Sequence, residues 1–370
     1  MADKNDIPVV INGRIYNLSG YENTDYLQEV ANYMNSKIAE CKASDGFRRL
    51  NAEYQNILLP INIPDALPAY KVLTAENIFV MNQTRATTQR IRPLKILIVN
   101  IMPLKITTET QLLRLLSNTP LQLEVELIHM STHDSKNVPK EHLLTFYKTF
   151  KDIKENSYDG MIITGAPVEQ MPFEEVDYWN ELSEIFEWAK THVFSSFFIC
   201  WASQAALHYY YDIDKYLLKH KLTGVYRHHT NQRKMRRKIL RGFDYQFYAP
   251  HSRYTTVLKE DISSNPNLDI LAESDDAGVY LVASKDGSQF FVTGHPEYDP
   301  DTLDKEYKRD KEKPDVIAEL PKNYYLDDDP SQEIQVKWRS HAYLLFSNWL
   351  NYYVYQETPY DLNDLHDRKK

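Results

Sequence analysis

Between residues 94 and 200 the chain alternates short apolar runs with amphipathic segments. The runs at 94–102, 121–130, 158–165 and 193–200 are typical of buried strands, and helical patterns separate them at 108–118, 140–153 and 174–192. This alternation favours a parallel sheet, because each crossover connection carries a helix back across a face of the sheet. We therefore expect an α/β fold, a mostly parallel sheet with helices on both faces.

The first 58 residues have a different pattern. The stretch "PVVINGRIYNL" places two apolar runs around Asn12-Gly13, a turn pair typical of β-hairpins, and a helical pattern follows at 24–41. A hairpin with one amphipathic helix buries little surface by itself, so we expect a small α+β module at 1–58 that docks or dimerises. Three prolines in "PINIPDALPAY" interrupt any helix and mark the start of a second domain at 59–370.

Charge and cysteine content exclude several classes of protein. A net charge of -9 argues against a general affinity for nucleic acid, and the basic run at 233–241 is read as a solvated face or a loop over an anionic ligand. The two cysteines, Cys41 and Cys200, lack the spacing of a disulfide framework or a thiolate zinc site. No apolar run approaches about 18 residues, and "MADKNDIPVV" lacks the basic and long apolar regions that a secretory signal is expected to have. We expect a cytoplasmic protein without metal, nucleic-acid or membrane partners.

Cys200 stands where a predicted strand runs directly into the helical stretch "WASQAALHYY". Open α/β sheets bind ligands at the carboxyl ends of their strands, and a sharp strand-to-helix turn projects a side chain into that site. A helix N-terminus also favours the thiolate form of a cysteine. The alternative is an inert core cysteine, because cysteine is among the most buried residue types.

A nucleophilic cysteine needs a base, and "VTGHPEYDP" offers one. His295 follows an apolar strand at 290–292, and Pro296 fixes the chain so that His295 and Glu297 can point the same way. The carboxylate would then orient the imidazole. The alternative is a loop histidine beside an unrelated surface glutamate. The adjacent pair His228-His229 is a weak metal signal, because no carboxylate lies near it in sequence.

Two stretches of the chain resemble known families. The segments "IRPLKILIVNIMPLK", "ITGAPVE", "ICWASQAAL", "KLTGVYRHH", "APHSRY" and "VTGHPEYD" are similar to the homoserine O-acyltransferase (MetA) family over about 60–365, a family whose fold is similar to class I glutamine amidotransferases. The segment "VVINGRIYNLSGYENTDYLQEVANYMNSKI" resembles the head of the cell-division protein ZapA over about 8–59.

The first resemblance implies ping-pong acyl transfer in methionine biosynthesis. Cys200 matches the nucleophile that accepts the acyl group, His295 the general base, and Glu297 the carboxylate that partners it. The thioester oxyanion is expected to be held by Lys105 and by backbone N–H groups at Trp201 and beyond. Acyl-CoA is then a co-substrate, and no permanently bound cofactor or metal is expected.

The same resemblance implies the substrate contacts. Lys221, Ser252 and Arg309 match substrate-binding positions, and an arginine suits the carboxylate of L-homoserine. Glu169 lies where the family has glutamate with acetyl-CoA and glycine with succinyl-CoA. A glutamate there would fill space and repel the terminal carboxylate of a succinyl chain, so we predict an acetyl donor.

Three alternatives stay open at this point. One is homoserine O-succinyltransferase, and another is a cysteine hydrolase of the glutamine amidotransferase type. The third is an interaction protein of the division ring that contacts FtsZ through residues 1–58. Sequence does not decide between homoserine and serine as the acceptor, or the oligomeric state, for which a homodimer is one option.

Overall fold

The computed structural model describes residues 5–11, 14–20, 68–76, 92–119, 121–133, 137–314 and 316–365, together with the single helical residues 28, 32 and 35. The chain divides into two compact units, Met1–Leu67 with Met81–Arg90 and Pro68–Val80 with Ile91–Lys370. The predicted boundary between residues 58 and 59 lies outside the described residues, as does nearly all of the helix predicted at 24–41. Both stay predictions.

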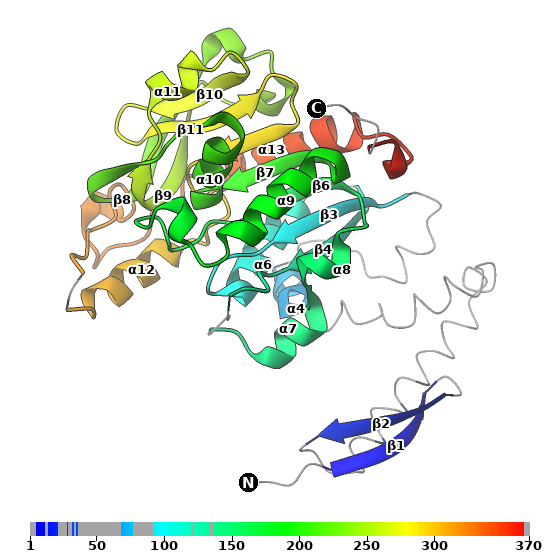
Figure 1. Ribbon diagram of the computed structural model, residues 1–370. Coiled ribbons are helices and arrows are strands. Elements are labelled where there is room, and N and C mark those ends of the chain that lie inside the picture. The colour runs from blue at the N-terminus through cyan, green and yellow to red at the C-terminus, as the bar shows by residue number, and fades with distance from the viewer. Residues whose placement is uncertain are drawn as a thin grey trace. The chain divides into compact units, whose positions relative to one another are not determined.

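The N-terminal unit contains the predicted hairpin. Strands β1 (Asn5–Ile11) and β2 (Arg14–Gly20) pair antiparallel from Asn5↔Gly20 to Ile11↔Arg14 (Figure 1). The turn pair between them, residues 12 and 13, lies outside the described residues. The pairing confirms the hairpin that the sequence predicts.

The second unit is built on a ten-stranded sheet of order β5-β4-β3-β6-β7-β12-β11-β10-β8-β9. Its strands are β3 (Leu94–Val99), β4 (Leu123–Ile128), β5 (Tyr147–Lys148), β6 (Tyr158–Ile163), β7 (Val193–Ile199), β8 (Tyr216–Thr230), β9 (Gln246–Thr256), β10 (Leu268–Ser274), β11 (Gly278–Ser284) and β12 (Gln289–Val292). Neighbours from β5 to β12 pair parallel, and those from β12 to β9 pair antiparallel. The mostly parallel α/β sheet is confirmed.

Helices cover both faces of this sheet (Figure 1). The described helices are α4 (Pro68–Ala75), α6 (Lys105–Leu116), α7 (Lys140–Phe146), α8 (Phe150–Ile153), α9 (Trp179–His192), α10 (Trp201–Tyr211), α11 (Lys259–Ser264), α12 (Thr302–Lys311) and α13 (Arg339–Trp349). One core packs α9 and α10 against Phe198 of β7, and the other packs α6 and α13 against Phe197 and Ile199 of the same strand. Successive side chains of β7 point to opposite faces of the sheet, so this one buried strand contributes to both cores. None of the described helices is long and apolar enough to cross a lipid bilayer.

Two of the predicted helices were wrong in extent. The segment 140–153 is not one helix, because Tyr147 and Lys148 form β5 beside β4 between α7 and α8. The Tyr147 hydroxyl donates to buried Glu109 at 2.6 Å, and Thr149 starts α8 with a capping box. Tertiary burial and capping therefore override the helical period. The segment 174–192 starts with a 3-10 turn at Phe173–Glu175, and its α-helix begins only at Trp179.

Candidate active site

The candidate residues gather at one edge of the sheet because four adjacent parallel strands end there. Strands β3, β6, β7 and β12 are neighbours in that order, with Ile163 opposite Phe198 and Val292 opposite Ile199. The segments that follow these strands carry, in the same order, Lys105, Glu169, Cys200 and His295. The carboxyl edge of the sheet therefore collects residues nearly 200 positions apart in sequence.

Cys200 forms the turn between β7 and α10. Its side chain is buried, and its backbone has φ 51° and ψ −116°, a conformation that is strained for a residue with a side chain. The backbone N–H of Cys200 donates to the carbonyl of Val292 at 2.7 Å, and its carbonyl accepts the N–H of Ser203 at 3.0 Å. These bonds hold the sulfur at the N-terminus of α10, the geometry of a nucleophile elbow.

His295 and Glu297 form a buried pair beside this cysteine. Oε1 of Glu297 accepts from Nδ1 of His295 at 2.7 Å, and each side chain is 4% exposed. Burial disfavours the imidazolium, but the charges of Cys200 and Glu297 and hydrogen bonds to both outweigh it and raise the pKa of His295 well above its usual value. The imidazole therefore interacts with the sulfur on one side and with the carboxylate on the other.

Gly165 leaves the space next to the nucleophile open. A Cβ atom at this position would lie 3.3 Å from Cβ of Cys200 and 3.4 Å from Cε1 of His295. A side chain at 165 would thus crowd both Cys200 and His295. The sequence reasoning did not single out this glycine, although it is the last residue of the strand predicted at 158–165.

The two residues predicted to support the oxyanion are placed differently. Trp201 is the first residue of α10, so its N–H has no acceptor within the helix and faces the same end as Cys200. Nζ of Lys105 donates instead to the carbonyls of Asn100 at 2.5 Å and Met102 at 3.4 Å. Burial lowers the pKa of Lys105 to about 8. Its described hydrogen bonds tie down the turn after β3, and its role toward the oxyanion stays a prediction.

Glu169 points into the molecule. Its Oε2 accepts the backbone N–H of Tyr254 at 2.5 Å. Burial raises the pKa of Glu169, against the Tyr254 hydrogen bond and the positive charges of His295, Lys221 and Arg253. The carboxylate therefore lies on the catalytic side of its loop, within the electrostatic reach of the base.

Two of the predicted substrate-binding residues meet at one carboxylate. Oε2 of Glu306 accepts from the Ser252 hydroxyl at 2.5 Å and from Nζ of Lys221 at 3.4 Å, while its Oε1 accepts from the Tyr298 hydroxyl at 2.8 Å. The Tyr298 ring stacks on His295 with 4.1 Å between centroids. This network connects the two predicted substrate-binding residues to the predicted base.

Arg309 joins the network through Asp310. Its guanidinium donates to Oδ1 of Asp310 at 2.8 and 3.0 Å, and Oδ2 of Asp310 accepts from Lys221 at 2.9 Å. The sequence reasoning missed Glu306 and Asp310. Their spacing of four residues on α12 was the available signal, because residues at i and i+4 share a helix face.

Arg253, also missed, is a buried cation at this site. It is 1% exposed and donates to the carbonyls of Thr255 and Ala277, each at 2.5 Å. Burial lowers the pKa of Arg253, and the negative charges of Cys200 and Glu169 oppose this. Nε of Arg253 also donates to His251 at 3.4 Å. A fixed positive charge thus lies near both the nucleophile and Glu169.

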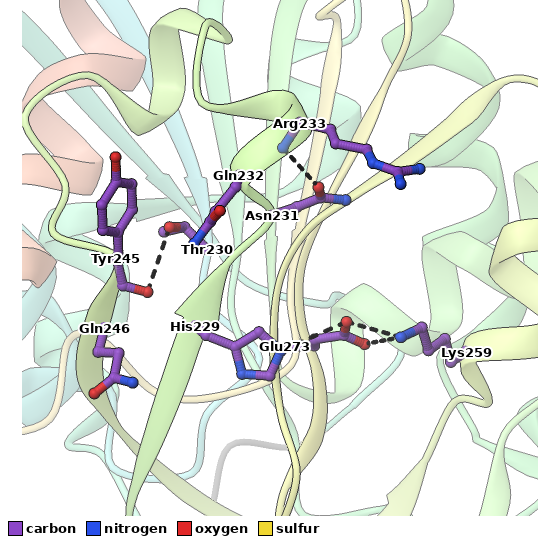
Figure 2. A pocket seen from close by; sticks show the side chains of 9 residues that line it. All are labelled: His229, Thr230, Asn231, Gln232, Arg233, Tyr245, Gln246, Lys259 and Glu273. Carbon is purple, nitrogen blue, oxygen red and sulfur yellow. Dashed lines mark hydrogen bonds and ion pairs between the residues drawn. The ribbon is translucent and has the colours of Figure 1, made fainter.

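The residues of the weak metal signal lie apart. His228 is buried, with its Nε2 3.0 Å from Nε2 of His251, whereas His229 lines a surface pocket of about 700 Å³ (Figure 2). In that pocket Glu273 lies between His229 at 3.6 Å and Lys259 at 2.7 Å. No group of three metal-ligating side chains occurs within the described ranges. The residues that line this pocket include none of Cys200, His295 and Glu297, so it is not the candidate catalytic site.

Comparison with known proteins gives two family matches. The family model for homoserine O-succinyltransferase matches residues 60–360, and the model for cell division protein ZapA matches residues 7–98. The second match extends beyond residue 59, where the sequence resemblance had been expected to stop.

Curated relatives match most of the chain. A homoserine O-acetyltransferase of Catenibacterium mitsuokai is 98% identical over 312 residues, which are 84% of this chain and 100% of the relative. Those of Bacteroides fragilis and Acetivibrio thermocellus are 58% and 59% identical over 307 residues, 83% of this chain and 100% of each relative.

Among solved structures, a glutamine amidotransferase from Thermotoga maritima has a TM-score of 0.46 at 12% identity and covers 70% of this chain and 98% of that one. One from Methylobacillus flagellatus also has a TM-score of 0.46 at 12% identity, with 73% and 99% covered.

Proposed function

The chain belongs to the homoserine O-succinyltransferase family, and we propose that it transfers an acetyl group from acetyl-CoA to the hydroxyl of L-homoserine through an S-acetyl intermediate on Cys200. The enzyme is an acyltransferase of methionine biosynthesis. The observation that carries the proposed mechanism is the buried His295–Glu297 pair at 2.7 Å, whose imidazole interacts with the sulfur of Cys200.

In the first half-reaction His295, paired with Glu297, acts as an acid. The thiolate of Cys200 attacks the thioester carbonyl of acetyl-CoA, and negative charge develops on the carbonyl oxygen. The N–H of Trp201, at the open N-terminus of α10, is a donor for this oxygen, worth about 3 kcal/mol in comparable sites. The carbon–sulfur bond to coenzyme A then breaks, and the departing thiolate takes the proton of His295.

The second half-reaction uses the same imidazole as a base. The hydroxyl of homoserine attacks the S-acetyl carbonyl while His295 accepts its proton. The carbon–sulfur bond to Cys200 breaks, which releases O-acetylhomoserine and restores the thiolate and the imidazolium. Proton and charge balance over the two steps, and Glu297 keeps its charge throughout.

The Glu306 network supports an amino-acid acceptor. Glu306 and Asp310 supply carboxylates for an ammonium group, and Arg309, whose side chain is 54% exposed, supplies a guanidinium for a carboxylate. The link from Glu306 through Tyr298 to His295 supports a zwitterion site beside the base. A free amino acid with a side-chain hydroxyl fits this combination of charges.

The position of Glu169 supports acetyl as the donor. Its carboxylate faces the catalytic residues, so the terminal carboxylate of a succinyl group would meet a like charge in a buried site. A cytoplasmic location fits the proposed mechanism, because a reducing compartment keeps a free catalytic cysteine reduced.

Intact-mass spectrometry after mixing with acetyl-CoA or succinyl-CoA, without homoserine, tests the proposal. We expect one acetyl group on the wild type, none on C200S, and release of the group as O-acetylhomoserine when homoserine is added. No adduct from either donor would contradict the covalent mechanism. Ammonia release from glutamine would instead favour a hydrolase of the amidotransferase type.

The ZapA match supports a second, separate role for the N-terminal module. The antiparallel hairpin and the family match over residues 7–98 favour contact with division filaments or self-association of this module. Co-sedimentation with FtsZ filaments tests it, by comparing the full chain with one that lacks residues 1–58. Equal sedimentation of both would contradict the role. Sedimentation velocity of the same two chains tests whether the enzyme is a homodimer.

A further inference from the structure

We propose that Lys215 is a positioning residue for acyl-donor selection, which anchors the loop 166–173, here called the acyl loop, so that Glu169 stays aimed at the acyl group. This inference rests on the proposed function, since it concerns which donor the same site accepts. Lys215 follows α10, the helix that begins directly after Cys200.

The ammonium of Lys215 makes two contacts with the acyl loop. Nζ donates to the carbonyl of Met171 at 2.5 Å and lies 4.1 Å from the ring centroid of Phe173. The first is a charge-assisted hydrogen bond to the backbone and the second a cation–π contact. Burial lowers the pKa of Lys215 to about 8, against the carboxylates of Glu169 and Glu174. The cation is thus held at the loop and not in bulk solvent.

The C-terminal end of the acyl loop is packed on the same helix. The Phe173 ring stacks on His208 of α10 at 4.8 Å and on Trp179 of α9 at 5.3 Å. His208 lies between two carboxylates, with Nδ1 3.0 Å from Asp214 and Nε2 3.3 Å from Glu174. His208 and Lys215, near and just after the C-terminal end of α10, therefore both contact the C-terminal end of the acyl loop.

The middle of the acyl loop carries Glu169, whose only described hydrogen bond is with the N–H of Tyr254 on β9. Between Glu169 and the Lys215 contact, the loop is closed by one turn, in which the N–H of Met171 donates to the carbonyl of Val168 at 3.1 Å. Because Met171 lies only two positions after Glu169, a shift of Met171 is expected to shift Glu169 as well. Removal of the Lys215 anchor would therefore let the Glu169 carboxylate move away from the acyl group.

The chemical consequence is specific to the donor. An acetyl group has no carboxylate for Glu169 to repel, so looser placement of Glu169 changes its use little. The activity with succinyl-CoA should rise, because the repulsion and the steric exclusion of a succinyl group both depend on where the Glu169 carboxylate lies. The expected signature is a change in the ratio of two activities, and not a general loss.

The experiment compares K215M with K215R and with K219M, a matched control at an exposed lysine on β8. For each, kcat and KM are measured with acetyl-CoA and with succinyl-CoA at saturating homoserine. We expect K215M to lower the acetyl-to-succinyl ratio of kcat/KM by about ten-fold, the scale of one lost charge-assisted bond. K215R should keep most of the preference, since it keeps the charge and donors, and K219M should match the wild type.

An unchanged acetyl-to-succinyl ratio in K215M overturns the inference, and an equal loss of activity with both donors is one form of that result, which would mean a merely structural role. If K215M does not fold, K215Q removes the same cation and answers the same question, with K215R as its control. Hydrogen–deuterium exchange over residues 166–176 separates this inference from the proposed function. A wild type that acylates with neither donor refutes the function, whereas exchange in K215M equal to the wild type refutes the anchor whatever the activity.

Discussion

Replacing Glu297 with glutamine tests whether the negative charge of this side chain acts on His295, with almost no change in side-chain shape. Glu297 and His295 are both buried, and Oε2 of Glu297 has no hydrogen-bond partner among the described residues. The charge of this carboxylate is therefore directed at the imidazole. E297Q keeps the side-chain volume and removes the charge.

The expected loss follows from the geometry. With Nδ1 and Oε1 2.7 Å apart, the two charge centres lie about 4 Å from each other, and unit charges at that separation attract by about 4 kcal/mol at an effective dielectric constant of about 20. At about 1.4 kcal/mol per ten-fold change, E297Q should lower kcat about a thousand-fold. The amide can also present its NH₂ group to Nδ1 and favour the wrong tautomer, which adds to the loss.

The assay is steady-state acetyl transfer to homoserine, with E260Q as a matched control on the exposed first turn of α11. The pH profile gives a second readout. Because Glu297 helps to raise the pKa of His295, E297Q should lower that pKa, and the alkaline limb of kcat/KM for acetyl-CoA should move to lower pH. Thermal denaturation checks that E297Q is folded. A folded E297Q within about three-fold of the wild-type kcat would refute the electrostatic role of the pair.

Three further predictions concern neighbouring residues. G165A should lower kcat/KM by about ten-fold or more without loss of fold, because its Cβ would lie 3.3 Å from Cβ of Cys200; unchanged kinetics with acetyl-CoA would show that this crowding does not disturb catalysis. E169G should raise kcat/KM for succinyl-CoA by about ten-fold or more, and E169Q by less, because glutamine removes the repulsion and keeps the bulk; equal succinyl activity in both variants and the wild type would contradict the donor assignment. Lys105 has a folded-state pKa of about 8 against 10.5, so the unfolded chain binds more protons between these values and stability rises with pH there, by about 3 kcal/mol. Urea unfolding near the two ends of that interval should show this rise in the wild type and not in K105M, and equal slopes would contradict it.

Much of the architecture could be predicted because buried parallel strands have a clear signature. The strands before Cys200 and His295 read as apolar runs, and two parallel strands that are neighbours must end at the same edge. The segment 140–153 could not be predicted correctly, because the reason for its break lies elsewhere in the chain. Tyr147 leaves the helical path to reach Glu109, 38 positions earlier in the sequence.

Sequence predicted some residues of the candidate site and missed others. Cys200 and His295 carry reactive groups next to strand ends, which local pattern can detect. Arg253, Glu306 and Lys215 read as ordinary surface charges in sequence, and only their burial and long-range contacts distinguish them. Gly165 has no side chain to notice, and its importance lies in the atoms that surround it.

The proposed mechanism requires His295 to give up a proton in the first half-reaction and to accept one in the second. The charges of Glu297 and Arg253 stay constant during the cycle, so neither can drive that reversal. The charge on Cys200 does change, because acylation turns the thiolate into a neutral thioester. Since the negative charge of Cys200 helps to raise the pKa of His295, acylation removes part of what holds the proton on the imidazole. The covalent step therefore converts the acid into the base required next, and the buried pair needs no movement to serve both halves of the reaction.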